Sequence, residues 1–124
     1  MPLVLLIEDG ADIRSSVAEL LMAEGYSVAQ APGRASALAF LRTAKPDAII
    51  LDYALPCATE GAAFLTEKAK IAEAASIPVI VTSGFALPSQ LEGAAAILAK
   101  PFDIDCLLGL VRRFVPAPDA TSAA

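Results

Sequence analysis

Short apolar runs alternate along the chain with segments in which apolar residues recur every three or four positions. The runs are rich in Leu, Ile, Val and Ala, as buried strands are, and the intervening segments are typical of amphipathic helices. This alternation predicts an α/β fold, a doubly wound five-stranded parallel sheet with helices on both faces. We expect its strands at Leu3 to Ile7, Ser27 to Ala31, Ala48 to Leu51, Pro78 to Thr82 and Ala95 to Ala99.

The first helix is expected to begin with Asp12 as its N-cap and to end at Gly25, because glycine accepts the left-handed backbone that terminates many helices. Its apolar positions predict one buried stripe, formed by Ile13, Val17, Leu20 and Leu21.

Further helices are expected at about Arg34 to Thr43 and Gly61 to Ala75. Between Gly84 and Gly93 few helix-forming residues remain, so a fourth helix should be short, irregular or absent. The last helix has the clearest pattern, with Asp103 as N-cap and arginines in its final turn. Its apolar face would consist of Ile104, Leu107, Leu108 and Val111.

The size of the chain indicates one domain. Its 124 residues suffice for a single core, which we expect over residues 1–115, followed by a flexible, proline-bearing tail over residues 116–124. No apolar run approaches the roughly 18 residues of a membrane span, and no Lys or Arg precedes the first run as in a secretory leader. We therefore expect a soluble cytoplasmic protein.

Charge and composition exclude several classes of function. The net charge is −5 and the basic residues form no stripe, which argues against direct nucleic-acid binding. The chain has no histidine, so a Ser-His or Cys-His nucleophile pair, an imidazole metal ligand and a phosphohistidine are all excluded. Cys57 and Cys106 are isolated and cannot form a zinc site alone.

Charged residues follow three of the expected strands. Glu8 and Asp9 come after the first strand, Asp52 after the third and Lys100 after the fifth. The carboxyl ends of parallel strands meet at one edge of a sheet, so these four residues should share one cleft. Two carboxylates about 5 Å apart repel by roughly 3 kcal/mol at an effective dielectric near 20, a cost that a divalent cation and the lysine would relieve. The cluster predicts a metal-assisted site for an anion.

Aspartyl phosphate chemistry fits this cluster. Asp52, at the end of a central strand, can act as a nucleophile toward phosphorus, and Mg²⁺ prefers oxygen ligands such as carboxylates. Asp9 and Asp52 fit as direct ligands and Glu8 as a ligand through water. Lys100 and the Thr82 hydroxyl would each contact a phosphoryl oxygen.

With these residues in place, the chain resembles the response-regulator receiver domain of bacterial two-component signalling, a CheY-like domain, over about Leu3 to Val115. The motifs that carry the resemblance are the pair Glu8-Asp9, Asp52 followed by Pro56, Thr82, and Lys100-Pro101 followed by Phe102.

The resemblance implies a flavodoxin-like strand order 2-1-3-4-5 and phosphorylation of Asp52 by a histidine kinase or a histidine phosphotransfer protein. It implies that Mg²⁺ is held by Asp9, Asp52 and the Ala54 carbonyl, and that the peptide before Pro101 is cis. It also places partner docking on the outer face of the first helix, near Arg14 and Ala18, although these residues could equally belong to an ordinary solvated face.

Three positions depart from the family pattern. Gly61 lies nine residues after Asp52 where the family usually has eight, Ile97 replaces a common aromatic residue, and the interval from Thr82 to Lys100 is short. Readout by a rotating tyrosine at position 97 is therefore excluded. We expect the switch in the segment from Ser83 to Pro88, with Gly84 as a hinge and Phe85 as the moving side chain.

Alternative functions remain open at this point. A phosphohydrolase with an aspartyl intermediate would usually carry a second acid where Ala54 stands, and a flavin carrier would need a glycine-rich loop after the first strand, which is missing. A receiver-like scaffold that never accepts phosphate is a further reading. The chain could also be a receiver without an output domain or the terminal piece of a larger kinase.

Overall fold

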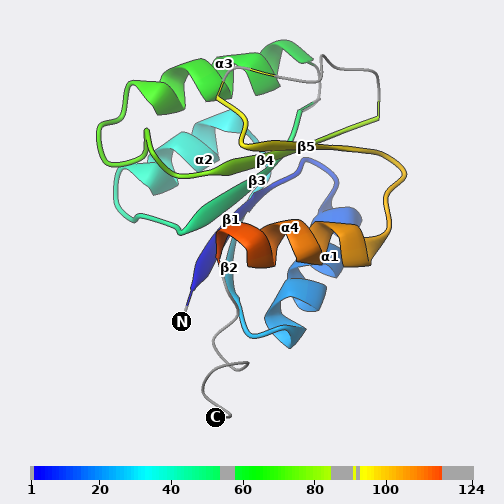
Figure 1. Cartoon of the computed structure of the whole chain (residues 1–124). Helices are drawn as coiled ribbons and strands as arrows, with labels where there is room; N and C mark the ends of the chain where they lie inside the picture. Colours follow the sequence, from blue (N-terminus) through cyan, green and yellow to red (C-terminus); the bar gives the residue numbers. More distant parts are fainter. Residues whose placement is uncertain (1, 54–57, 85–90, 92, 116–124) are drawn as a thin grey trace.

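Five parallel strands form one sheet between two layers of helices in a computed structural model that describes residues 2–53, 58–84, 91 and 93–115 (Figure 1). The strand order is β2-β1-β3-β4-β5, as expected for the flavodoxin-like topology. The strands are β1 (Leu3–Ile7), β2 (Ser27–Ala31), β3 (Ala48–Asp52), β4 (Val79–Ser83) and β5 (Ala96–Ala99).

The two inner strands next to the site are wholly buried. Every residue of β3 and of β4 is buried, and the pairing of the two strands ends with Asp52 opposite Thr82. The predicted strands agree with the structure to within one residue, because continuous apolar runs are typical of strands covered on both faces. Asp52 and Thr82 therefore lie side by side at the carboxyl edge of the sheet.

Four helices lie within the described part of the chain, two on each face of the sheet (Figure 1). They are α1 (Ala11–Ala23), α2 (Arg34–Leu41), α3 (Ala58–Ala69) and α4 (Ile104–Phe114). None of them is long and apolar enough to span a membrane.

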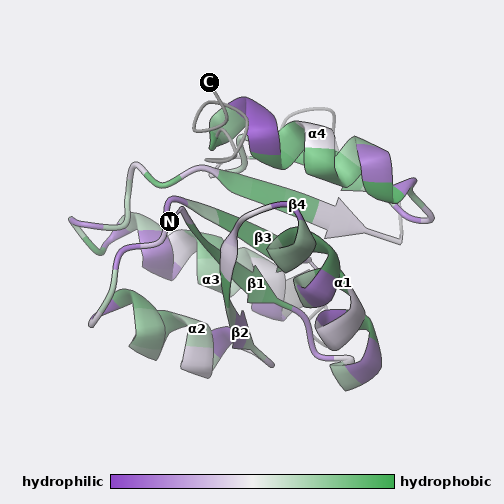
Figure 2. Ribbon diagram, turned by 90° about the horizontal axis from the view of Figure 1, so that it is seen from below, coloured by the Kyte–Doolittle hydropathy of each residue, from purple (hydrophilic) through white to green (hydrophobic). Residues whose placement is uncertain are grey.

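Two hydrophobic clusters flank the sheet. One lies under α2 and α3 and includes Leu38 and Phe64, and the other lies under α1 and α4 and includes Leu21 and Leu107. Figure 2 shows the strands mostly in the colour of hydrophobic residues and the helices with both hydrophobic and hydrophilic residues, as expected for amphipathic helices on a buried sheet. The expected face of α4 is confirmed, with Leu107, Leu108 and Val111 buried and Ile104 half-buried.

The predicted start and stripe of α1 are partly wrong. The N-cap is Gly10 rather than Asp12, because the Arg14 N–H donates to the Gly10 carbonyl and so makes the first helical hydrogen bond. Ile13 is 55% exposed and Leu20 is 43% exposed, whereas Leu21 is fully buried.

The expected docking residue Ala18 is also fully buried and so does not belong to an outer face. The buried side of α1 is centred on Ala18 and Leu21, and Ile13 and Leu20 fall on its flank. The expected end of this helix is confirmed, since Gly25 has a φ of 99°.

The predicted bounds of α3 are also wrong. The helix begins at Ala58 rather than Gly61 and ends at Ala69 rather than Ala75. After Ala69 the chain continues in turns, in which the Ile71 and Ala74 N–H groups donate to carbonyls three residues earlier. These turns place Ile71 and Ala74 against the core under α3 before the chain enters β4.

The remaining sequence predictions concern segments between and after these elements. Gly84, Leu91 and Gly93 belong to no helix, and residues 85–90 and 92, where the weak fourth helix was expected, lie outside the described residues. The expected tail at residues 116–124 also lies outside them. Asp103 is the N-cap of α4 as predicted, although its side chain makes no capping hydrogen bond with the described residues.

Candidate functional site

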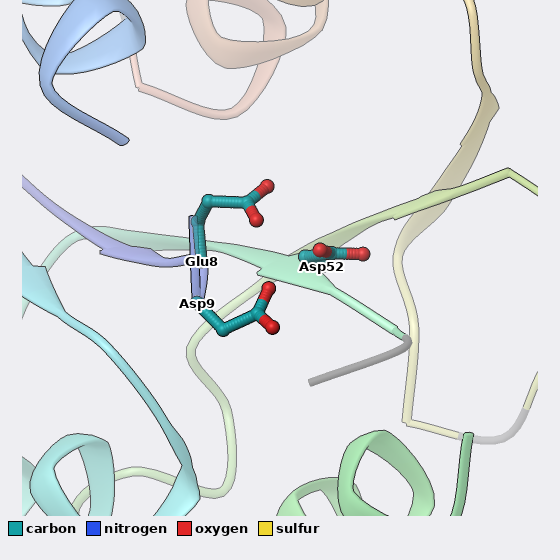
Figure 3. Close-up of side chains that lie close together, drawn as sticks. All are labelled: Glu8, Asp9 and Asp52. Atoms are coloured by element: carbon teal, nitrogen blue, oxygen red, sulfur yellow. The ribbon is translucent and has the colours of Figure 1, made fainter. Parts of the chain in front are cut away.

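Three carboxyl groups converge at the carboxyl edge of the sheet, as the sequence predicted. Glu8 and Asp9 follow β1, Asp52 ends β3, and one oxygen atom from each lies within 4.8 Å of the other two (Figure 3). Glu8 and Asp52 are buried, and Asp9 is exposed. The strand order brings the groups together, because β1 and β3 are neighbours in the sheet.

Lys100 completes this cluster from the end of β5. Its Nζ lies 3.6 Å from Glu8 Oε1 and 3.4 Å from Asp52 Oδ1. The Lys100 N–H donates to the Ser83 carbonyl at 2.7 Å, which fixes the start of the loop after β5 against β4. The peptide between Lys100 and Pro101 is cis, as the family resemblance implied.

Glu8 is the acid whose proton affinity the fold changes most clearly. The pKa of Glu8 is raised to about 7, chiefly by burial and also by the nearby Asp52 carboxyl, while a hydrogen bond from the Gly10 N–H and the Lys100 charge oppose the rise. The Gly10 nitrogen lies 3.1 Å from Glu8 Oε2. In the metal-free domain this carboxyl group is therefore partly protonated near neutral pH.

Thr82 and Ser83 line the same edge from β4. Thr82 is 4% exposed, and its carbonyl accepts a hydrogen bond from the Tyr53 N–H at 2.9 Å. Ser83 is 1% exposed, and Gly84 after it is exposed.

Two predicted site residues lie outside the described part of the chain, namely Ala54, a predicted metal ligand, and Phe85, a predicted switch residue. Ile97, at the usual aromatic position, is half-buried and packs against the core under α2 and α3. The expected switch therefore lacks an aromatic side chain on β5.

Two features beside the acidic cluster had not been predicted. A hollow of about 520 Å³ is lined by Ile13, Gly84, Lys100, Pro101 and Phe102. Arg14, which had been placed on a docking face, turns inward, and its Nη1 donates to the Glu8 carbonyl at 2.8 Å. No spacing rule in a single sequence marks a contact between a helix residue and a main-chain oxygen six residues earlier.

The donor set suits a hard divalent cation. All three side chains offer carboxylate oxygens, which Mg²⁺ prefers, and no thiol or imidazole lies among them. A doubly charged ion there would offset the mutual repulsion of the carboxylates. The residues thus fit a magnesium site, and Lys100 adds a cation for a bound anion.

Comparison with known proteins gives the family. Residues 4–112 match the response regulator receiver domain. The chain belongs to this family. Among curated relatives, this receiver domain is 30% identical over 118 residues to sporulation initiation phosphotransferase F of Bacillus subtilis, covering 91% of this chain and 93% of that protein. It is 34% identical over 111 residues to the transcriptional regulatory protein PdtaR of Mycobacterium tuberculosis, with 85% of this chain and 52% of PdtaR covered.

Solved structures agree with this assignment. The chemotaxis response regulator CheY4 of Vibrio cholerae matches this receiver domain with a TM-score of 0.82 and 28% identity, over 93% of this chain and 99% of CheY4. TrrA of Thermotoga maritima, solved in complex with Mg(2+)-BeF, matches with a TM-score of 0.81 and 25% identity, over 93% of this chain and all of TrrA at 100%. The chain is therefore a receiver domain of two-component response regulators with the CheY-like fold.

Proposed function

We propose that Asp52 accepts a phosphoryl group from a histidine kinase or a histidine phosphotransfer protein, and that the modified domain then binds its partner differently. The observation that carries this proposal is the convergence of three carboxyl groups and the Lys100 ammonium at the end of the buried strand β3. Other acids on the described surface lack this combination of burial, a cation and neighbouring acids.

The chemistry requires one covalent exchange. A carboxylate oxygen of Asp52 attacks the phosphorus of the donor phosphohistidine, the P–N bond breaks, and the donor imidazole takes a proton from solvent water and leaves as a neutral base. Hydrolysis of the resulting mixed anhydride by water restores Asp52 and releases inorganic phosphate. The domain promotes its own modification and its reversal, so we propose a signalling phosphoacceptor rather than an enzyme with an independent substrate.

Asp9 and Asp52 would hold Mg²⁺ directly, Glu8 would hold it through water, and the Ala54 carbonyl would be a further ligand. When bound, Mg²⁺ offsets the negative charge of the carboxylates and of the incoming phosphoryl oxygens. The complex of TrrA with Mg(2+)-BeF supports this assignment, because that relative shares the fold over almost the whole chain.

Lys100 and Thr82 would detect the modification. Lys100 is already 3.4 Å from Asp52 Oδ1, and Thr82 is the strand partner of Asp52. A phosphoryl group adds negative charge and acceptor oxygens that the ammonium and the hydroxyl can bind. This would draw the segment at Ser83, Gly84 and Phe85 toward the site, and Ile97 would respond by repacking rather than by rotating an aromatic ring.

The donor protein would approach along the edge where Ile13 and the hollow beside Lys100 are exposed. Ile13 is 55% exposed and lines this hollow together with Pro101 and Phe102. An apolar rim beside a charged centre suits a partner helix that carries the phosphohistidine. This surface replaces the one around Ala18, which is buried.

The test is intact mass spectrometry after incubation with acetyl phosphate and Mg²⁺. Wild type is compared with Asp52→Asn and with Asp105→Asn, which removes an exposed acid in the first turn of α4. We expect one added phosphoryl group on wild type and on Asp105→Asn and none on Asp52→Asn, with the addition lost in excess EDTA.

The other functions give different outcomes. No mass gain on wild type, with the fold intact by circular dichroism, would indicate a receiver-like scaffold that works without phosphate. Release of inorganic phosphate far in excess of protein would indicate a phosphohydrolase. Modification of Asp52→Asn equal to that of wild type would place the acceptor elsewhere.

A further inference from the structure

We propose that Arg14 is a positioning residue that holds the backbone of the turn from Glu8 to Gly10 in the conformation that Mg²⁺ binding requires. This inference rests on the proposed function. Its basis is that Arg14 closes the turn with both its main chain and its side chain. The Arg14 N–H donates to the Gly10 carbonyl at 2.8 Å, and Nη1 donates to the Glu8 carbonyl at 2.8 Å.

Hydrogen bonds from the N–H groups of Glu8 and Gly10 hold the rest of this turn. The Glu8 N–H donates to the Ala31 carbonyl at 3.1 Å, which ties it to β2, and the Gly10 N–H donates to the Glu8 carboxyl group at 3.1 Å. The Glu8 carbonyl therefore depends on Arg14 for its hydrogen bond from α1. This carbonyl shares a rigid peptide plane with the Asp9 nitrogen, so fixing it also fixes the backbone from which the Asp9 side chain extends.

Asp9 needs this support more than the other two acids. Its side chain is exposed, whereas Glu8 is 7% exposed and Asp52 is 6% exposed. Packing therefore orients Glu8 and Asp52, and the backbone conformation of the turn has to orient Asp9. A metal site loses affinity when the groups that orient its ligands are removed, typically by tenfold to a hundredfold.

The guanidinium group of Arg14 is partly buried beside the turn. Its Nε is shielded from solvent and has no hydrogen-bond partner among the described residues. A polar group that is removed from water in this way carries a cost that an arginine on an open surface avoids. The hydrogen bond from Nη1 to the Glu8 carbonyl helps to offset this cost.

Charge and positioning make opposite predictions for the removal of Arg14. The guanidinium has the same sign as Mg²⁺, so its charge alone disfavours the ion, and removing that charge should tighten binding. If the side chain instead holds the turn, removing it should weaken binding. The sign of the change therefore separates the two roles.

The experiment measures Mg²⁺ affinity by isothermal titration calorimetry at constant ionic strength, using the full chain. The variants are Arg14→Met, Arg14→Lys and Arg42→Met, the last of which removes an exposed arginine at the C-cap of α2 and so matches the change in net charge. We expect the dissociation constant to rise about tenfold for Arg14→Met, to rise less for Arg14→Lys, and to stay within about twofold of wild type for Arg42→Met.

Each outcome bears on one claim. Affinity of Arg14→Met that equals or exceeds that of Arg42→Met overturns the inference while Mg²⁺ binding by wild type stands. If Arg14→Met does not fold, the comparison of Arg14→Lys with Arg42→Met decides, since the lysine retains one donor and the charge. Failure of wild type to bind Mg²⁺ overturns the proposed function, and this inference with it.

Discussion

Gly61 packs directly against the main-chain carbonyl of Tyr53, so closely that a Cβ atom at position 61 would lie 2.1 Å from the Tyr53 oxygen. Tyr53 follows Asp52, and the contact therefore fixes the first turns of α3 against the residue next to the proposed phosphoacceptor. Gly61 makes this contact although it lies nine residues after Asp52. Position 61 thus requires glycine because of close approach rather than because of an unusual backbone angle.

Gly61→Ala should destabilise the domain by about 1–3 kcal/mol, because either α3 or the end of β3 has to move to admit a methyl group. Gly109→Ala is the matched control, since Gly109 also lies in a helix but a Cβ there would meet nothing within 4 Å. The control should gain roughly 0.5–1 kcal/mol from its better helix propensity. Urea unfolding of both variants measures the difference, and equal shifts would contradict the close contact.

The strand pattern could be predicted because it depends on local composition. The apolar runs at β1 and β2 matched the structure to the residue, and β3 and β4 were displaced by a single residue at one or both ends. Helix bounds were less accurate. The end of α3 depends on where Ile71 and Ala74 can reach the core, which is a tertiary constraint that a single sequence does not display.

Periodicity identified α1 as a helix but not which of its apolar residues are buried. Ile13→Ala should change the free energy of unfolding by less than about 0.5 kcal/mol, because Ile13 is 55% exposed. Leu21→Ala should cost about 2–5 kcal/mol, because Leu21 is fully buried. Urea unfolding of the two variants tests this. Similar decreases in the free energy of unfolding would mean that Ile13 is buried, as the apolar stripe predicted from the sequence implied.

The candidate site was predicted well where topology alone brings residues together. Residues at the carboxyl ends of β1, β3, β4 and β5 must meet at one edge, so the grouping of Glu8, Asp52, Thr82 and Lys100 followed from strand assignment. The inward turn of Arg14 could not be predicted, because it depends on the exact path of the chain between β1 and α1. The burial of Glu8 and the resulting change in its pKa also required the three-dimensional packing.

Glu8 should make the metal-free domain less stable as the pH rises from about 4.5 to about 7. Unfolded Glu8 loses its proton near its ordinary pKa of 4.5, whereas burial raises the pKa in the folded domain to about 7. Between these values the folded state binds more protons, so the free energy of unfolding falls with rising pH. Urea unfolding in EDTA should show this fall for wild type and a weaker one for Glu8→Gln, with the exposed Glu19→Gln behaving as wild type.

Mg²⁺ binding should release a proton from Glu8 at about pH 6, below the raised pKa of about 7. A cation at the cluster favours the ionised carboxyl group, so binding and deprotonation are linked. Calorimetric titration in buffers with different ionisation enthalpies measures the number of protons released. The release should diminish above about pH 8 and be reduced in Glu8→Gln; binding heats that do not depend on the buffer at about pH 6 would contradict the raised pKa of Glu8.

Lys68 is a buried amine near the end of α3, only 4% exposed, and its Nζ donates to the Ala75 carbonyl at 3.1 Å. Burial lowers the pKa of Lys68 from its ordinary value of 10.5. Between the lowered and the ordinary value the unfolded chain binds more protons than the folded domain, so this lysine makes the free energy of unfolding rise with pH. Lys68→Met removes that contribution and should be compared with Lys70→Met, which removes an exposed lysine after the same helix.

We therefore expect the stability of wild type relative to Lys68→Met to increase as the pH is raised through the alkaline range toward 10.5. The methionine is one atom shorter than the lysine but keeps an unbranched apolar stem, so most of the packing under α3 is retained while the ionisable group is lost. Urea unfolding at several pH values, with both variants measured beside wild type, gives the two differences directly. A difference for Lys68→Met that stays constant with pH, or one that Lys70→Met reproduces, would show that the buried position of the ammonium does not control its protonation.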